Sequence, residues 1–95
     1  CLVDGPLDLR TAIDAEALRT KGIESPLEGR ADALIFPDIE AGNVFYKAIT
    51  GMMHLPNACM MAGTTHPVVL PSRGDDADTK YNSMAMAALT LNRHA

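Results

Sequence analysis

Short apolar runs alternate with helix-like patterns along these 95 residues, and this alternation constrains the fold more than any other feature. Four runs have the length and composition of strands: residues 1–3, 33–36, 58–62 and 68–70. The second of them, Ala33-Leu34-Ile35-Phe36, has no polar member, which is typical of a strand covered on both faces. The order strand, helix, strand, helix, strand, strand, helix predicts an α/β fold with right-handed crossovers and a largely parallel sheet with flanking helices.

Three helices are expected from the period of the apolar side chains. The first covers about residues 7–20 and ends before Gly22, a natural C-terminal stop. The second begins after Asp38, and Asp75 or Asp76 can cap the third. The expected apolar stripe of the third helix is Tyr81, Met84, Ala85, Ala88 and Leu89.

Composition and spacing exclude several classes of function. The net charge is −4 and the eight basic residues are scattered, so no basic patch indicates a nucleic-acid interface. No apolar run is long enough to span a membrane, and no signal peptide is recognisable. Cys1 and Cys59 form no metal or redox motif, and His54, His66 and His94 share no metal-like spacing. We therefore expect no metal site, no membrane partner and a reduced, cytoplasmic setting.

The chain opens on an apolar run without an initiator methionine, so we expect it to be a piece of a longer protein. Its most informative stretch is residues 71–80, between an expected strand and the last helix. Ser72 and Arg73 lie just before a helix N-terminus, where the helix dipole and the guanidinium together can hold an anion. The alternative is a capped turn with a solvated arginine.

Ligands of such folds gather at the carboxyl ends of parallel strands. Three turns qualify: Asp4-Gly5-Pro6, residues 37–43 and the turn that begins at Ser72. Gly42 costs a helix interior about 1 kcal/mol relative to alanine, so its place beside Asn43 indicates close packing there. That packing partner is either a ligand or the underlying sheet.

Several motifs in one register resemble the phosphate acetyl/butyryltransferase family, and they cover essentially the whole chain. They are residues 3–7 (Val-Asp-Gly-Pro-Leu), residues 37–44 (Pro-Asp-Ile-Glu-Ala-Gly-Asn-Val), Tyr46-Lys47, residues 67–70, Ser72-Arg73 and Thr79-Lys80. Asp78-Thr79-Lys80 and residues 4–7 are most similar to the butyryltransferase branch, whereas Gly74 looks like the acetyltransferase branch.

The resemblance implies a two-lobed α/β enzyme, similar in fold to isocitrate and isopropylmalate dehydrogenases, with its active site between the lobes. Residues 1–70 would complete the second lobe, and residues 71–95 would form a crossing segment and a final helix that returns to the first lobe. The N-terminal remainder of the enzyme would be the main partner of this piece, which alone would be inactive. The family is homo-oligomeric.

The implied reaction is acyl-CoA plus phosphate giving acyl phosphate plus CoA, with coenzyme A and phosphate as substrates and no cofactor. By resemblance, Arg73 would hold the acyl phosphate and Ser72 would donate a hydrogen bond to the reacting group. Thr79 occupies the position where the acetyltransferase branch has its aspartate, which leaves Asp78 as the candidate acid. The expected substrate-binding residues are Gly5, Pro6, Gly42, Asn43 and Thr79.

Two other classes remain open. Similar domains fused to malic enzymes look like acyl-CoA sensors without transferase activity, and the missing acid at Thr79 fits that reading. A purely structural subunit, assembled through its apolar helices, is the second. A dehydrogenase is disfavoured because the chain has no dinucleotide fingerprint.

Overall fold

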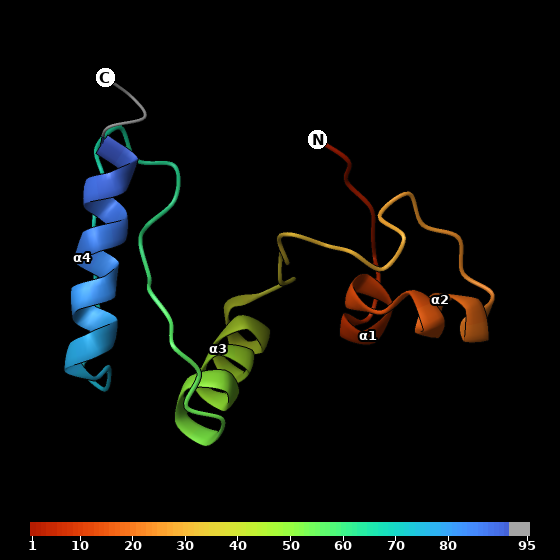
Figure 1. The fold of residues 1–95 in the computed structure, drawn as a ribbon, viewed down its shortest axis with the longest axis horizontal. Coiled ribbons are helices and arrows are strands. Elements are labelled where there is room, and N and C mark those ends of the chain that lie inside the picture. Colours follow the sequence, from red (N-terminus) through yellow and green to blue (C-terminus); the bar gives the residue numbers. More distant parts are fainter. Residues whose placement is uncertain (92–95) are drawn as a thin grey trace. The chain divides into compact units, whose positions relative to one another are not determined.

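The computed structural model describes residues 1–91 (Figure 1). The elements are α1 (Leu9–Ile13), α2 (Ala15–Lys21), α3 (Ile39–Lys47), the π-helical turn η1 (Ala48–Met52) and α4 (Ala77–Leu91). The chain divides into two compact units, Cys1–Ile39 and Glu40–Ala95, and each is described by itself. None of the helices within residues 1–91 is both long and apolar enough to cross a membrane.

In the first unit, the single helix expected over residues 7–20 is wrong, because the structure has two short helices. Asp14 interrupts them with an extended backbone, and its carboxylate accepts a 2.9 Å hydrogen bond from the Glu16 amide at the start of α2. A short acidic side chain can accept a hydrogen bond from the amide at the start of the next helix, and this favours an extended backbone at its own position over continuation of the first helix. The expected end of the helix is confirmed, because Gly22 caps α2 in the left-handed conformation.

The loop after α2 folds back onto the junction of α1 and α2. Gly29 is buried there with φ +71°, and a Cβ atom on it would lie 2.4 Å from the backbone nitrogen of Ala15. The Ala31 amide then donates a 3.0 Å hydrogen bond to the Ala12 carbonyl. This contact needs a glycine, both for the backbone conformation and for the space.

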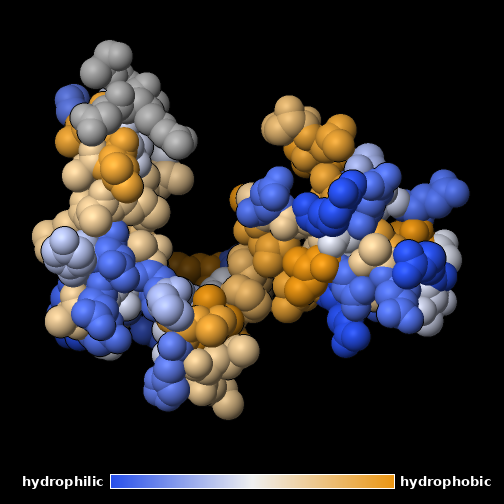
Figure 2. All heavy atoms as spheres, in the orientation of Figure 1, coloured by the Kyte–Doolittle hydropathy of each residue, from blue (hydrophilic) through white to orange (hydrophobic). Residues whose placement is uncertain are grey.

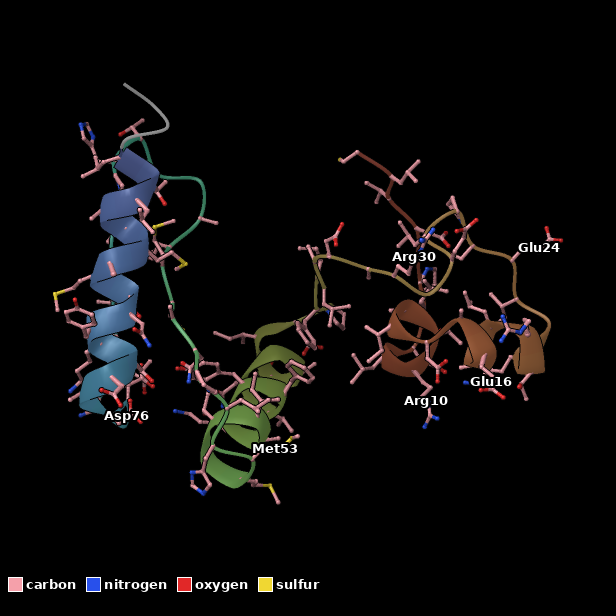
Figure 3. The ribbon with its side chains drawn as sticks, viewed as in Figure 1. Arg10, Glu16, Glu24, Arg30, Met53 and Asp76 are labelled. Carbon is pink, nitrogen blue, oxygen red and sulfur yellow. The ribbon has the colours of Figure 1, made fainter. Side chains whose placement is uncertain are left out.

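Helix α3 starts directly after Asp38, as the sequence predicts, and all of it except Ile39 belongs to the second unit. The helical path continues through η1, where the Met53 amide reaches back five residues to the Ala48 carbonyl at 3.1 Å. The residue that follows, His54, has φ +54° and turns the chain away from the helix axis. Figure 3 labels Met53 at this end of the helical segment.

Helix α4 is capped by Asp76, one of the two residues expected in that role, whose carboxylate accepts a 2.7 Å hydrogen bond from the Thr79 amide. Figure 3 labels Asp76 at the N-terminal end of α4. The expected apolar stripe is not the packed face, because Tyr81 and Leu89 are 69% and 68% exposed. Small polar residues are buried instead: Ser83 is fully covered, and its hydroxyl oxygen accepts from the Cys59 amide at 2.8 Å. A small side chain lets the extended segment approach the helix closely and satisfies its backbone.

The predicted largely parallel sheet is wrong for residues 1–91. Within them the structure has only one isolated antiparallel bridge, in which the Met61 amide donates to the Val68 carbonyl at 2.9 Å. An apolar run becomes a strand only where a neighbouring segment takes up its amides and carbonyls. Ile35 and Leu70, in two of the expected strands, remain 93% and 73% exposed. Figure 2 shows such apolar side chains on the surface of the chain.

Candidate functional site

A chain of hydrogen bonds connects the turn before α4 to the end of α3. The Tyr46 phenol donates to Oδ1 of Asp75 at 2.8 Å, and Oδ2 of Asp75 accepts from the Ser72 amide at 2.9 Å. The Asp75 amide in turn donates to the Ser72 carbonyl at 3.1 Å, which closes the turn. One aspartate therefore fixes the backbone of the segment that presents Ser72 and Arg73.

The Ser72 side chain makes a second link to α3. Its Oγ accepts from the Lys47 ammonium at 3.3 Å and from the Gly74 amide at 3.4 Å. Ser72 is half-buried, whereas Arg73, next to it, is exposed. The loop thus offers a hydroxyl and a guanidinium side by side, which is the donor arrangement expected of an anion-binding turn.

The environment of Tyr46 keeps its phenol protonated. A hydrogen bond with Cys59, partial burial and the hydrogen bond to the Asp75 carboxylate, in that order, raise the pKa of Tyr46. The hydroxyl also lies 3.2 Å from Oδ1 of Asn57, and Oδ1 of Asp75 is the closer of these two oxygens. The 2.8 Å contact and the raised pKa both agree with a protonated phenol that donates to Asp75.

Thr79 and Asp78, adjacent in the first turn of α4, have different environments. Thr79 is 5% exposed, and its amide and hydroxyl hydrogen bonds to Asp76 lower the pKa of that carboxyl. Asp78 is exposed. Successive helix residues point about 100° apart, so the buried threonine and the exposed acid belong to different faces. The structure thus gives Thr79 a capping and packing role, and Asp78 a carboxylate open to solvent.

The other expected substrate-binding residues divide between the two units. Gly42 and Asn43 lie in α3, half-buried and exposed respectively. Asn43 is one turn before Lys47, so both residues are on the helix face that Ser72 contacts. Gly5 and Pro6 belong to the first unit and are exposed.

Sequence reasoning missed the roles of Tyr46, Lys47 and Asp75. The first two stood out only as part of a resemblance motif, and Asp75 only as a possible helix cap. No spacing rule connects Tyr46 with Asp75, since 29 positions separate them. The one available signal was a tyrosine next to a lysine at the C-terminal end of α3.

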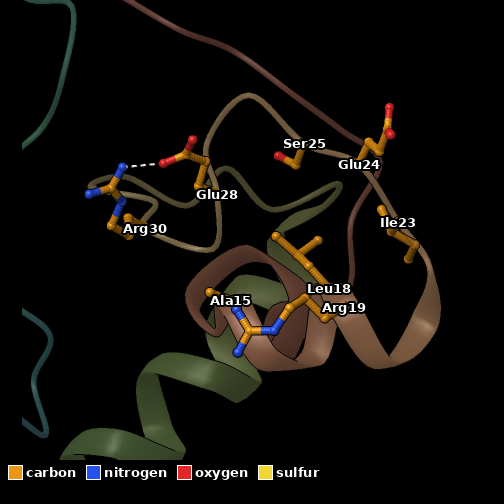
Figure 4. A pocket seen from close by; sticks show the side chains of 8 residues that line it. All are labelled: Ala15, Leu18, Arg19, Ile23, Glu24, Ser25, Glu28 and Arg30. Carbon is orange, nitrogen blue, oxygen red and sulfur yellow. Dashed lines mark hydrogen bonds and ion pairs between the residues drawn. The ribbon is translucent and has the colours of Figure 1, made fainter.

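The first unit contains a shallow hollow of about 540 Å³ that holds none of the predicted site residues (Figure 4). Its lining residues are Ala15, Leu18, Arg19, Ile23, Glu24, Ser25, Glu28 and Arg30. The charges in it are mixed, and Arg30 is paired with Glu28. The better candidate is the Ser72 turn, because it holds the predicted site residues Ser72 and Arg73 and the Lys47 ammonium contacts it. Within residues 1–91, no group of three or more histidine, cysteine or acidic side chains could hold a metal ion.

Comparisons with known proteins agree with the resemblance read from the motifs. The family model described as phosphate acetyl/butaryl transferase matches residues 1–88. The phosphate butyryltransferase of Clostridium beijerinckii is 45% identical over 94 residues, which are 99% of this chain and 31% of that protein. The phosphate acetyltransferase of Thermotoga maritima is 46% identical over 89 residues, which are 94% of this chain and 30% of that protein.

A solved structure, the branched-chain phosphotransacylase of Enterococcus faecalis V583, matches this chain with a TM-score of 0.77 and 37% identity. The match covers 92% of this chain and 33% of that one. Fold and motifs thus define a protein of an acyltransferase family. The chain belongs to the phosphate acetyl/butyryltransferase family and spans about a third of the length of the curated relatives it matches.

Proposed function

We propose that this chain is the C-terminal third of a phosphate acyltransferase that converts butyryl-CoA and phosphate into butyryl phosphate and CoA. The observation that carries the proposal is the turn at Ser72 and Arg73. Its backbone is fixed by Asp75, its hydroxyl is bonded to Lys47, and its guanidinium is exposed. Family membership supports phosphate and acyl-CoA as the substrates of such a turn.

In the reverse direction, the CoA thiol attacks the carbonyl carbon of butyryl phosphate. A new C–S bond forms, the C–O bond to phosphate breaks, and the thiol proton must be removed. Arg73 offsets the negative charge on the acyl phosphate, and the Ser72 hydroxyl donates to the reacting group. Gly42 and Asn43 in α3 contact a further part of the substrates, and Gly5 and Pro6 keep the substrate-binding role that the family resemblance implies.

Asp78 is the candidate base for the thiol proton. It is the exposed carboxylate of the first turn of α4, whereas Asp76 is used as a cap and Thr79 is buried. A carboxylate open to solvent can accept a proton from a bound thiol and release it to water. Thr79 then acts by holding the helix start rather than by touching substrate.

The remainder of the enzyme is the proposed partner of the exposed apolar surface. Val3, Ile35, Ile39 and Leu70 are each more than 70% exposed, and they lie in or beside the expected strands. Covering such side chains removes apolar area from water and stabilises by about 25 cal/mol per Å². The sheet neighbours, the first lobe and a homo-oligomeric contact would all come from outside these residues.

The test is phosphate-dependent release of free thiol from butyryl-CoA and acetyl-CoA by the full-length protein that carries this sequence. We expect release with butyryl-CoA to be faster, and Arg73→Ala to reduce it about a hundredfold or more, since a charge-stabilising donor is lost. Arg30→Ala, a matched loss of an exposed arginine in the first unit, should leave it unchanged. Folded protein that binds CoA but releases no thiol would instead identify an acyl-CoA sensor, the alternative that the buried Thr79 fits.

A further inference from the structure

We propose that Lys47 binds the phosphate that receives or releases the acyl group at this site, as a second cation beside Arg73 and together with the Ser72 hydroxyl. This inference rests on the proposed acyltransferase function and adds a binding residue to it. Three observations support it: the contact between Lys47 and Ser72, the unused donor capacity of both groups, and the way α3 holds the lysine in place.

The first observation is the contact itself. Nζ of Lys47 lies 3.3 Å from Oγ of Ser72, although the two residues are 25 positions apart in the chain. The contact brings a full positive charge to the hydroxyl that precedes Arg73. Lys47 is exposed, so its ammonium group is open to a ligand from solution.

The second observation concerns hydrogens. An ammonium has three N–H donors, and the contact with Ser72 uses one of them. The Ser72 oxygen accepts from both Lys47 and the Gly74 amide, so its own hydrogen is used by neither contact. A hydroxyl that accepts from a cation is a stronger donor to its next partner. Lys47 and Ser72 therefore present neighbouring donors that a tetrahedral oxyanion can accept together.

The third observation is that Lys47 is held by neutral groups. Besides Ser72, its ammonium contacts the ring of Tyr46, with 5.5 Å between Nζ and the ring centroid. The phenol of that ring is fixed by Asp75, so the surface beneath the lysine is itself anchored. Neither contact cancels the charge of the ammonium, which leaves it available for an anion.

Coenzyme A also carries phosphates, but they lie at the end of the molecule remote from its thiol. Lys47 contacts Ser72, the residue proposed to donate to the reacting group. The phosphate group that Lys47 binds is therefore the one at the reaction centre. This is inorganic phosphate in one direction and the phosphoryl group of the acyl phosphate in the other. The KM for phosphate and the KM for butyryl-CoA distinguish the phosphate at the reaction centre from the phosphates of coenzyme A.

The test uses the full-length protein with Lys47→Met, Lys47→Arg and the control Lys21→Met. Lys21 is an exposed lysine of the first unit that pairs with Asp8, so its replacement removes the same charge elsewhere. We expect Lys47→Met to raise the KM for phosphate about tenfold, the usual effect of losing one charge-assisted hydrogen bond. The KM for butyryl-CoA should stay unchanged, and Lys47→Arg should recover most of the phosphate affinity.

Binding of inorganic phosphate can be measured without turnover, from the broadening of the phosphate signal in phosphorus NMR spectra. Phosphate binding that depends on Lys47 without thiol release would uphold this site and overturn the transferase function. Thiol release with an unchanged KM for phosphate in Lys47→Met would overturn the site alone. A raised KM for butyryl-CoA instead would assign Lys47 to the phosphates of coenzyme A and also overturn the proposal.

Discussion

The phenol of Tyr46 donates a 2.8 Å hydrogen bond to Oδ1 of Asp75 and so joins the last turn of α3 to the turn before α4. The second oxygen of the same carboxylate holds the Ser72 amide. The position of Ser72 and Arg73 thus depends on a residue of another helix. This relation makes Tyr46 a positioning residue for the proposed site.

Replacing Tyr46 with phenylalanine should weaken that positioning. The change leaves one oxygen of Asp75 without its donor, which we expect to cost about 1–2 kcal/mol of unfolding free energy in chemical denaturation. Thiol release should fall about tenfold through kcat, because the turn samples other conformations. Tyr81→Phe, an exposed tyrosine of α4, is the matched control and should change neither quantity. Wild-type kcat in Tyr46→Phe would contradict the positioning role.

Ionisation of Tyr46 offers a second check of the same contact. Hydrogen bonding with Cys59, partial burial and the Asp75 carboxylate raise the pKa of Tyr46 above its ordinary value of about 10. A raised pKa stabilises the fold fully below pH 10, and this contribution is lost as pH rises through the pKa of the folded state. The phenolate absorbance that Tyr46→Phe removes should therefore develop only above pH 10. Ionisation of Tyr46 at or below pH 10 in the folded protein would show that the contact is absent.

Local signals in the sequence predict local structure here. Gly22 and Asp76 end and begin helices through hydrogen bonds to residues one turn away, so their roles can be read from sequence alone. The sheet could not be read in this way, because strands need distant partners and residues 1–91 provide only the bridge between Met61 and Val68. An apolar run indicates that a segment is buried in the folded protein, but it does not identify the segment that packs against it.

The same limit applies to the site. Ser72 and Arg73 stand out through their place before a helix, a local pattern that the structure retains. The contact of Lys47 with Ser72 depends on how α3 packs against the turn, which the sequence does not encode locally. Burial of Thr79 has a similar origin, because it lies one turn before Ser83 on the helix face that the Cys59 amide contacts.

Asp8 should contribute to the acid stability of the first unit. Its hydrogen bond with Lys21, followed by those from the Thr11 amide and hydroxyl, lowers its pKa from 3.8 to about 2. A lowered pKa contributes stability above pH 3.8, and this contribution is lost as pH falls toward 2. Asp8→Asn should therefore be less stable than wild type at neutral pH and show a weaker loss between pH 4 and 2. Circular dichroism across this range measures both, and parallel curves for the two proteins would refute the assignment.

Gly29 should tolerate no side chain. Alanine there adopts a left-handed backbone and places its Cβ 2.4 Å from the Ala15 nitrogen, so the loop must move away from α2. We expect a loss of about 2–4 kcal/mol in unfolding free energy, the sum of backbone strain and overpacking. Gly63 has a similar φ of +84° with no atom within 4 Å, so Gly63→Ala isolates the backbone term, about 1–2 kcal/mol. Equal losses in the two variants would show that the close contact is unimportant.

Asp78 is the residue whose replacement tests the proposed base most directly. Asp78→Asn keeps the size of the side chain but removes the proton acceptor, so we expect kcat in the direction of thiol attack to fall about a hundredfold. Asp76→Asn is the matched control, because asparagine still caps the helix and no catalytic role is assigned to Asp76. The loss should shrink at high pH, where solution hydroxide forms the thiolate without help. A loss that is independent of pH, or one that Asp76→Asn reproduces, would assign proton removal to another group.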